Sequence, residues 1–270
     1  MKKLFVLSIL ASIFFISCKN TTSNPEVEDT ALPPEEVENV ALVTYPDKVS
    51  QVFEAHGGME QWNQMNTLSY EVMKGETPEL HTVSLKDRRV RINQPDWSIG
   101  YDGTQVWLLQ NMEDAYEGNA RFYHNLYFYF YAMPFVLGDD GIQYELIPNT
   151  KLLGKEYEGI KVSYDDGIGD SPKDEYILYF DPTTHKMEWL AYTVTYRSNE
   201  KSDRWSFIHY EKWETVNDVL LPKKLTWYTS EENSPKDVRS SMEFQNAKLY
   251  TTMPQESVFA MPEGAEVVER

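Results

Sequence analysis

Residues 121–137 read RFYHNLYFYFYAMPFVL, and this aromatic segment decides how the rest of the chain must fold. Between Phe122 and Phe135, eight of the fourteen residues are aromatic. Apolar residues recur every three or four positions, which predicts a helix that Pro134 kinks or ends. The helix would be apolar on nearly every side, so it must be covered on more than one side. We therefore expect a plug or lid lying inside a curved sheet.

The sequence around the aromatic segment favours β-strands. Segments of alternating polar and apolar character are separated by turn pairs such as Asp102-Gly103 and Asn217-Asp218. Many strands joined by short turns predict an antiparallel meander rather than a parallel α/β sheet. The predicted strands are 67–74, 79–86, 88–93, 104–110, 151–164, 174–180, 186–197, 203–216, 219–229 and 237–250.

A short helix is predicted before the first strand. Val49, Val52 and Phe53 have helical spacing within residues 47–55, and glycines follow directly after His56. Residues 59–65 are expected to add another helical turn. We therefore expect a mainly β (α+β) domain with a short N-terminal helix and an aromatic helical insert.

The N-terminus has the order of a secretory signal. Two lysines precede thirteen mostly apolar residues, 4–16, which are too few to span a bilayer core. Ser17 and Cys18 follow, and Cys18 is the chain's only cysteine. Residues 15–18 resemble the lipobox of bacterial lipoproteins, with Phe15 where leucine is usual. The resemblance implies cleavage before Cys18 and attachment of a diacylglycerol to its thiol. A plain secreted protein with a stray cysteine is the alternative.

The predicted organisation has three parts. Residues 1–17 are expected to be the signal peptide, and residues 18–45 an acylated cysteine followed by a disordered acidic tether rich in proline and acids. Residues 46–270 are expected to form the folded domain. Lys19 is not the aspartate associated with inner-membrane retention in enteric bacteria. We therefore expect a lipid-anchored protein of the cell envelope, at the periplasmic or surface face of the outer membrane.

Composition restricts the partners. The 270 residues carry a formal net charge of −18, which would repel nucleic acid and anionic lipid headgroups. The acidity itself is read as a solubility feature. With one cysteine, the chain has no intramolecular disulfide, and its fold must rest on an apolar core.

Motifs for catalysis or cofactor binding were not found. The five histidines lack the spacing of a zinc site, and no nucleophile elbow or phosphate-binding glycine loop is present. The acidic stretch 165–170 is read as a hairpin turn, with a calcium loop as the alternative. His56 is read as a packed ring at a helix end, with a catalytic histidine as the alternative. We expect no enzyme activity, no metal and no cofactor.

Three local signatures suggest a family. They are Tyr101-Asp102-Gly103 followed by Val106-Trp107, residues 179–184 (YFDPTT), and residues 217–222 (NDVLLP). Together with the short helix, the meander and the insert, they resemble the lipoprotein-carrier superfamily typified by LolA and LolB. Residues 56–62 (HGGMEQW) and the aromatic segment look more like uncharacterised Bacteroidota lipoproteins. The resemblance implies an open, half-closed antiparallel β-barrel with helices across its mouth and an apolar concave face.

The expected function is binding of a lipid, acyl chain or other hydrophobic molecule by this anchored domain. Tyrosine suits such a pocket because its ring is apolar and its hydroxyl is polar. The alternative is a non-catalytic structural or interaction lipoprotein, whose aromatic residues fill the barrel permanently and whose surface contacts another envelope protein. The predicted hydrophobic ligand-binding residues are Trp107, Tyr127, Phe130, Tyr131 and Phe135.

Overall fold

The computed structural model describes residues 44–165, 173–198 and 200–269. Residues Thr44–Arg270 form one compact unit. The predicted signal peptide, Cys18 and all but the last two residues of the predicted tether lie outside the described residues. Residues 166–170 of the acidic stretch also lie outside them.

Within the described residues, thirteen strands form one sheet in the order β13-β5-β4-β3-β2-β1-β12-β11-β10-β9-β8-β7-β6. Every neighbouring pair is antiparallel. β13 and β6 are the two edges, so the described sheet is open, which confirms the predicted fold class. The strands are β1 (Thr67–Val72), β2 (Glu79–Ser84), β3 (Val90–Asn93), β4 (Trp97–Tyr101), β5 (Val106–Gln110), β6 (Ile142–Leu152), β7 (Lys155–Tyr164), β8 (Tyr176–Phe180), β9 (Met187–Tyr192), β10 (Ser206–Val216), β11 (Val219–Glu231), β12 (Ser234–Tyr250) and β13 (Glu266–Val267).

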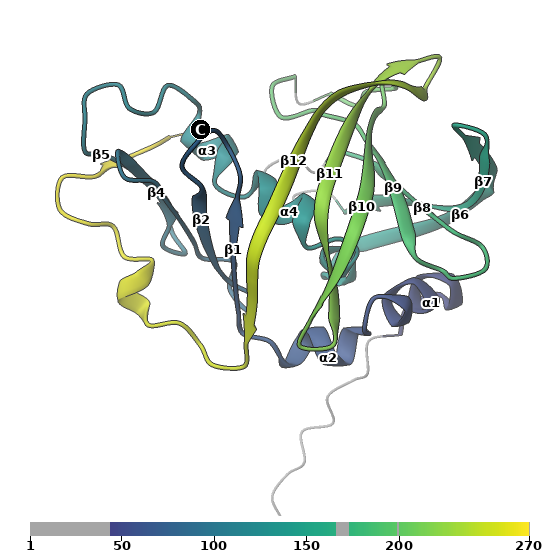
Figure 1. Ribbon diagram of the computed structural model, residues 1–270, viewed down its shortest axis with the longest axis horizontal. Coiled ribbons are helices and arrows are strands. Elements are labelled where there is room, and N and C mark those ends of the chain that lie inside the picture. Colours follow the sequence, from purple (N-terminus) through teal and green to yellow (C-terminus); the bar gives the residue numbers. More distant parts are fainter. Residues whose placement is uncertain (1–43, 166–172, 199, 270) are drawn as a thin grey trace, which may run out of the picture. The chain divides into compact units, whose positions relative to one another are not determined.

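The sheet consists of two meanders, β1–β5 and β6–β12, that are joined where β1 pairs with β12. The aromatic segment connects the two meanders along the chain and lies between them (Figure 1). It contains α3 (Ala120–Tyr123), α4 (Leu126–Tyr131) and the 3-10 helix η1 (Phe135–Gly138). A second 3-10 helix, η2 (Glu256–Val258), lies in the C-terminal segment beside β4 and β5 (Figure 1).

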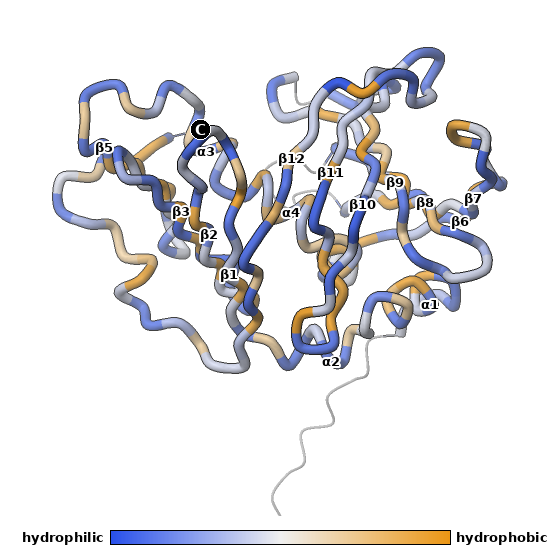
Figure 2. The backbone as a smooth tube through the Cα atoms, in the orientation of Figure 1, coloured by the Kyte–Doolittle hydropathy of each residue, from blue (hydrophilic) through white to orange (hydrophobic). Residues whose placement is uncertain are grey.

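The N-terminal helices cover one end of the sheet. α1 (Asp47–Ala55) has the predicted bounds and buries Val49, Val52 and Phe53, and α2 (Met59–Gln64) follows it. Both lie beside the β10–β11 turn (Figure 1). Hydrophobic residues also gather at this turn, whereas β12 is mostly hydrophilic (Figure 2). Gly57 has φ +111°, and a Cβ there would lie 2.2 Å from Asp218 O. Glycine therefore allows this close approach of helix end and turn.

The structure differs from the sequence-based prediction at three places. The aromatic segment is three short helical pieces rather than one helix, with α4 ending at Tyr131 before Pro134. β4 was missed because Trp97–Gly100 are all buried, so the strand lacks polar alternation. The N-terminal part of β6 was missed because this edge strand is largely exposed and contains Pro148, which is tolerated at a sheet edge.

Candidate functional site

The two ends of the aromatic segment differ in burial. Toward its C-terminal end, Tyr131 and Phe135 have no exposed surface and belong to the core. Toward its N-terminal end, Phe122 is 36 % exposed, and Leu126 and Tyr127 are only partly buried. The segment is therefore anchored at one end and presents apolar side chains at the other.

Capping explains where the first helical piece begins. Asn119 is the N-cap of α3, and its side-chain oxygen accepts a hydrogen bond of 2.9 Å from Phe122 N. Phe122 consequently projects from the first turn of a fixed helix. Its ring lies 5.0 Å from that of Tyr196, in the segment between β9 and β10.

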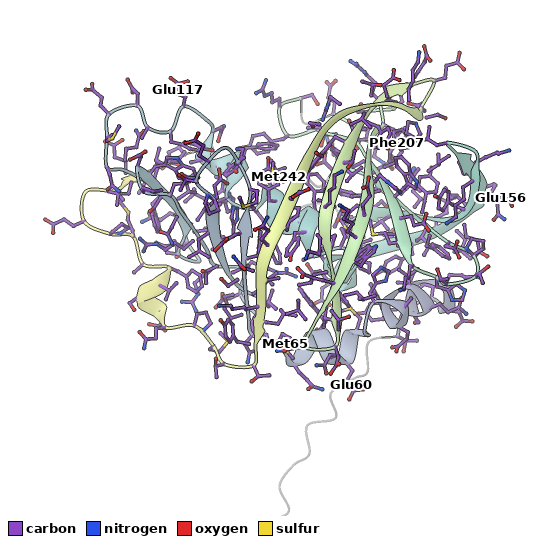
Figure 3. The ribbon with its side chains drawn as sticks, viewed as in Figure 1. Glu60, Met65, Glu117, Glu156, Phe207 and Met242 are labelled. Carbon is purple, nitrogen blue, oxygen red and sulfur yellow. The ribbon has the colours of Figure 1, made fainter. Side chains whose placement is uncertain are left out.

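Three cavities meet at Phe122 and Leu126, which line all of them. The sheet cavity, of about 350 Å³, lies between α4 and the strands and includes Phe130, Trp227 and Met242. The tyrosine cavity, of about 290 Å³, includes Tyr129, Tyr164, Tyr176 and Asp174. The loop cavity, of about 510 Å³, includes Lys74, Glu79 and Tyr116. Figure 3 labels Met242 on β12 and Glu117 in the loop before α3, one from the sheet cavity and one from the loop cavity.

The predicted binding residues separate into two groups. Tyr127 and Phe130 line the sheet cavity, and the Phe130 ring lies 5.0 Å from Tyr192 and 6.2 Å from Trp227. Trp107, Tyr131 and Phe135 line none of the three cavities.

The second group packs in the core. The Phe135 ring stacks on Trp62 at 4.7 Å, and the Tyr131 ring stacks on Phe244 at 4.4 Å. Trp107 is fully buried, and its Nε1 donates a hydrogen bond of 3.1 Å to Phe259 O. A binding role for these three residues stays a prediction, and their contacts are those of structural residues.

A polar network that lines the loop cavity was not predicted. Glu79 on β2 is 3 % exposed, and its carboxylate accepts a hydrogen bond of 2.5 Å from the Tyr123 hydroxyl. Lys74 Nζ lies 3.7 Å from the other carboxylate oxygen, and His81 Nε2 lies 3.4 Å from the first. One feature of the sequence could have indicated this network. Glu79 and His81 are two residues apart, so they lie on the same face of a predicted strand as the apolar Val83.

The charges in this network follow from burial and hydrogen bonding. Burial alone would raise the pKa of Glu79, but hydrogen bonds with His81 and Tyr123 and the charge of Lys74 lower it. Burial lowers the pKa of His81 despite its acidic partner. The network therefore holds a charged carboxylate beside a neutral imidazole at neutral pH.

His56 is a packed structural residue. It has no exposed surface, its Nδ1 lies 2.7 Å from Val52 O, and its Nε2 accepts a hydrogen bond of 3.3 Å from Met187 N. The ring also packs edge-on against Trp213 at 4.7 Å. Burial lowers its pKa to about 4, so the imidazole is neutral at pH 7. These contacts support the packed-ring interpretation over a catalytic one.

The described part of the chain contains neither a cluster of metal ligands nor a membrane-spanning helix. No group of three or more histidine, cysteine, aspartate or glutamate side chains there is placed to hold a metal ion. Across the same residues, no helix combines the length and the apolar character needed to cross a membrane.

Comparisons with known proteins give one family match and several distant structural matches. A protein-family model described as "Family of unknown function (DUF6503)" matches residues 102–243, which include the aromatic segment. None of the curated proteins matches the chain.

Three solved structures illustrate the structural matches. A LolA superfamily protein from Nitrosomonas europaea is 12 % identical with a TM-score of 0.45, and the match covers 79 % of this chain and 97 % of the other. A DUF1329 family protein from Desulfovibrio piger is 11 % identical with a TM-score of 0.47, covering 80 % and 100 %. A putative outer membrane lipoprotein-sorting protein domain from Vibrio parahaemolyticus is 8 % identical with a TM-score of 0.38, covering 74 % and 93 %.

Proposed function

We propose that this chain, which belongs to the DUF6503 family, is a non-catalytic, membrane-anchored lipoprotein. In this proposal the protein binds a hydrophobic molecule at its aromatic segment. The ligand is a lipid or another molecule with an acyl chain. It occupies the cavities that meet at Phe122 and Leu126.

The convergence of three cavities on two partly exposed apolar side chains carries this proposal. The sheet cavity has mainly aromatic and aliphatic walls, from Tyr127, Phe130, Trp227 and Met242. Small-molecule sites are concave, mostly apolar and on the order of 300–1,000 Å³. Each methylene removed from water contributes about 0.8 kcal/mol, so a short length of chain in this cavity suffices for binding.

The firm attachment of the segment supports a preformed site. The Tyr210 hydroxyl donates a hydrogen bond of 2.8 Å to Phe130 O, and the Tyr45 hydroxyl donates one of 2.9 Å to Gly138 O. These bonds hold the backbone of the segment in α4 and at the last residue of η1. A ligand would therefore meet Phe130 in a fixed position, which lowers the entropic cost of binding.

The anchoring part of the proposal rests on the sequence. Cys18 is acylated after signal cleavage, and the acidic tether joins it to the domain. The anchor keeps the cavities within reach of envelope lipids, at the periplasmic or surface face of the outer membrane. No other membrane contact is required.

A titration of the purified protein with 1-dodecanol, followed by tryptophan fluorescence, tests ligand binding. Trp227 lines the sheet cavity and reports directly. Leu126→Ser should weaken binding at least about tenfold, because it puts a hydroxyl where the chain lies. Leu146→Ser is the matched control, since Leu146 is 61 % exposed on β6 and lines none of the three cavities. Absence of binding to the unaltered protein, or equal losses in both variants, would refute the proposal.

A second function is favoured by the burial of Tyr131 and Phe135, which fill the inside of the sheet. In this case the domain is a solid scaffold that contacts another envelope protein. Crosslinking in cells would then capture one dominant partner, and Leu126→Ser would leave that crosslink in place.

A further inference from the structure

The tyrosine cavity contains an acidic side chain that has no basic partner among the described residues. Asp174 is half-buried, and among the described residues no lysine, arginine or histidine forms an ion pair with it. The adjacent Glu175 differs, because Lys161 lies 3.1 Å and Lys201 3.7 Å from its carboxylate. A partly buried carboxylate that lacks a counterion is costly unless something else neutralises it.

Asp174, just before β8, is held in place by Thr195, which follows β9. Its Oδ1 accepts hydrogen bonds of 2.6 Å from Thr195 N and 2.7 Å from the Thr195 hydroxyl. Burial raises the pKa of Asp174 even though these two bonds lower it. The fold thus fixes the position of the carboxylate, but the hydrogen bonds do not fully offset the cost of burying its negative charge. A cationic ligand would offset that cost.

Tyrosines surround this carboxylate. The centre of the Tyr176 ring lies 5.4 Å from that of Tyr129 and 5.9 Å from that of Tyr164, which it meets edge-on. The three rings therefore form one aromatic cluster. The hydroxyls of Tyr129 and Tyr164 are buried and have no hydrogen-bond partner within the part of the chain that the structure describes. Aromatic faces attract cations, and the two hydroxyl oxygens can accept hydrogen bonds from an ammonium group.

The basic side chains of the cavity do not supply the missing charge. Arg88 Nη2 binds Asp139 with distances of 2.5 and 2.7 Å to its two carboxylate oxygens. Arg121 and His124 also line the cavity, and neither forms an ion pair with Asp174. Because two arginines line the cavity, the test includes an anionic probe.

Asp174 also connects two of the cavities. It lines both the tyrosine cavity and the sheet cavity, and Phe122 and Leu126 lie along the same path. We propose that the ligand is an amphiphile whose ammonium head group binds at Asp174 in the tyrosine cavity, with its hydrocarbon chain along Leu126 into the sheet cavity. This inference rests on the proposed function and specifies the chemical class of its ligand.

Three twelve-carbon probes that differ in the head group test the inference. Dodecylammonium, 1-dodecanol and dodecanoate are titrated into the unaltered protein, Asp174→Asn and Asp96→Asn by calorimetry, with the two ionic probes below their micelle-forming concentrations and the alcohol below its solubility limit. The asparagine amide oxygen at position 174 can still accept the Thr195 hydrogen bonds, so the fold is retained. Asp96 is an exposed acid outside the three cavities, so its variant has the same net charge as Asp174→Asn.

The difference between the two variants is the readout, because a chain of net charge −18 attracts any cation weakly. We expect dodecylammonium to bind at least about tenfold more tightly than 1-dodecanol, with this preference lost in Asp174→Asn and kept in Asp96→Asn. Equal preference in both variants, or tighter binding of dodecanoate, would overturn the head-group inference while leaving the proposed function intact. Failure of all three probes to bind would refute the proposed function as well.

Discussion

The Tyr123 hydroxyl on α3 donates a hydrogen bond of 2.5 Å to the Glu79 carboxylate on β2, across 44 residues of chain. This contact fastens the start of the aromatic segment to the first meander. Lys74 Nζ donates to the same hydroxyl at 3.1 Å and lies 4.6 Å from the centre of the Tyr123 ring. The position of α3, and with it that of Phe122, therefore depends on a buried polar contact as well as on packing.

Replacing Tyr123 with phenylalanine tests this attachment. The ring and its packing are kept, but the buried carboxylate loses its shortest hydrogen bond, so unfolding should become easier by about 1–3 kcal/mol. Urea unfolding measures the loss. Tyr250→Phe is the control, because Tyr250 is 43 % exposed and its ring lies outside the network. A Tyr123→Phe protein as stable as the control variant would show that the contact contributes little.

His56 should make stability depend on pH. Its pKa is about 4 in the folded protein, below the 6.5 expected in the unfolded chain, so the unfolded state binds the proton first as pH falls. Stability contributed by His56 is therefore complete above about pH 6.5 and lost on acidification toward pH 4, by about 3 kcal/mol. Urea unfolding at pH 7, 5.5 and 4 should give a shallower pH dependence for His56→Gln. Equal slopes in the two proteins would exclude His56 as a cause.

Gly100 and Trp107 are cross-strand neighbours on β4 and β5. A Cβ on Gly100 would lie 2.2 Å from the Trp107 ring, which is fully buried and fixed by its hydrogen bond to Phe259 O. Gly100→Ala should therefore destabilise the protein by about 1–3 kcal/mol through overpacking. Adding Trp107→Phe should recover part of that loss, which a double-mutant cycle measures. Additive effects of the two substitutions would mean that the residues do not interact.

Cys18→Ala should release the protein from the membrane fraction without altering the folded domain. The apolar core belongs to the unit that begins at Thr44, so removal of the anchor leaves its packing unchanged. Fractionation of cells followed by circular dichroism of the released protein measures both effects. Retention in the membrane fraction would contradict the proposed lipidation, and loss of structure would contradict the tether.

The sequence predicted those parts of the fold that depend on local patterns. Val49, Val52 and Phe53 have helical spacing and glycines follow them, so the bounds of α1 were predicted correctly. Trp97 and Ile99 are buried on a strand where Ser98 and Gly100 are buried too, so alternation could not reveal β4. Burial on both faces arises from tertiary packing, which a single strand's pattern does not contain.

The same limit applies to the site. Tyr127 and Phe130 were predicted from residue type, and the structure places them on the sheet cavity. Aromatic composition could not separate them from Tyr131 and Phe135, because the break near Asn125 and the end of α4 decide which rings face the core. Asp174 was not singled out, since its lack of a basic partner among the described residues is a property of three-dimensional contacts in a chain rich in acids.

Native mass spectrometry of the protein, purified from its membrane without added lipid, tests the central claim most directly. Gentle ionisation should show a population that carries an additional noncovalent mass, and organic extraction should recover a molecule with a hydrocarbon chain. Leu126→Ser, prepared in the same way, should lose most of that population, whereas Leu146→Ser should keep it. A protein that is empty in every preparation and takes up no added 1-dodecanol would contradict the account.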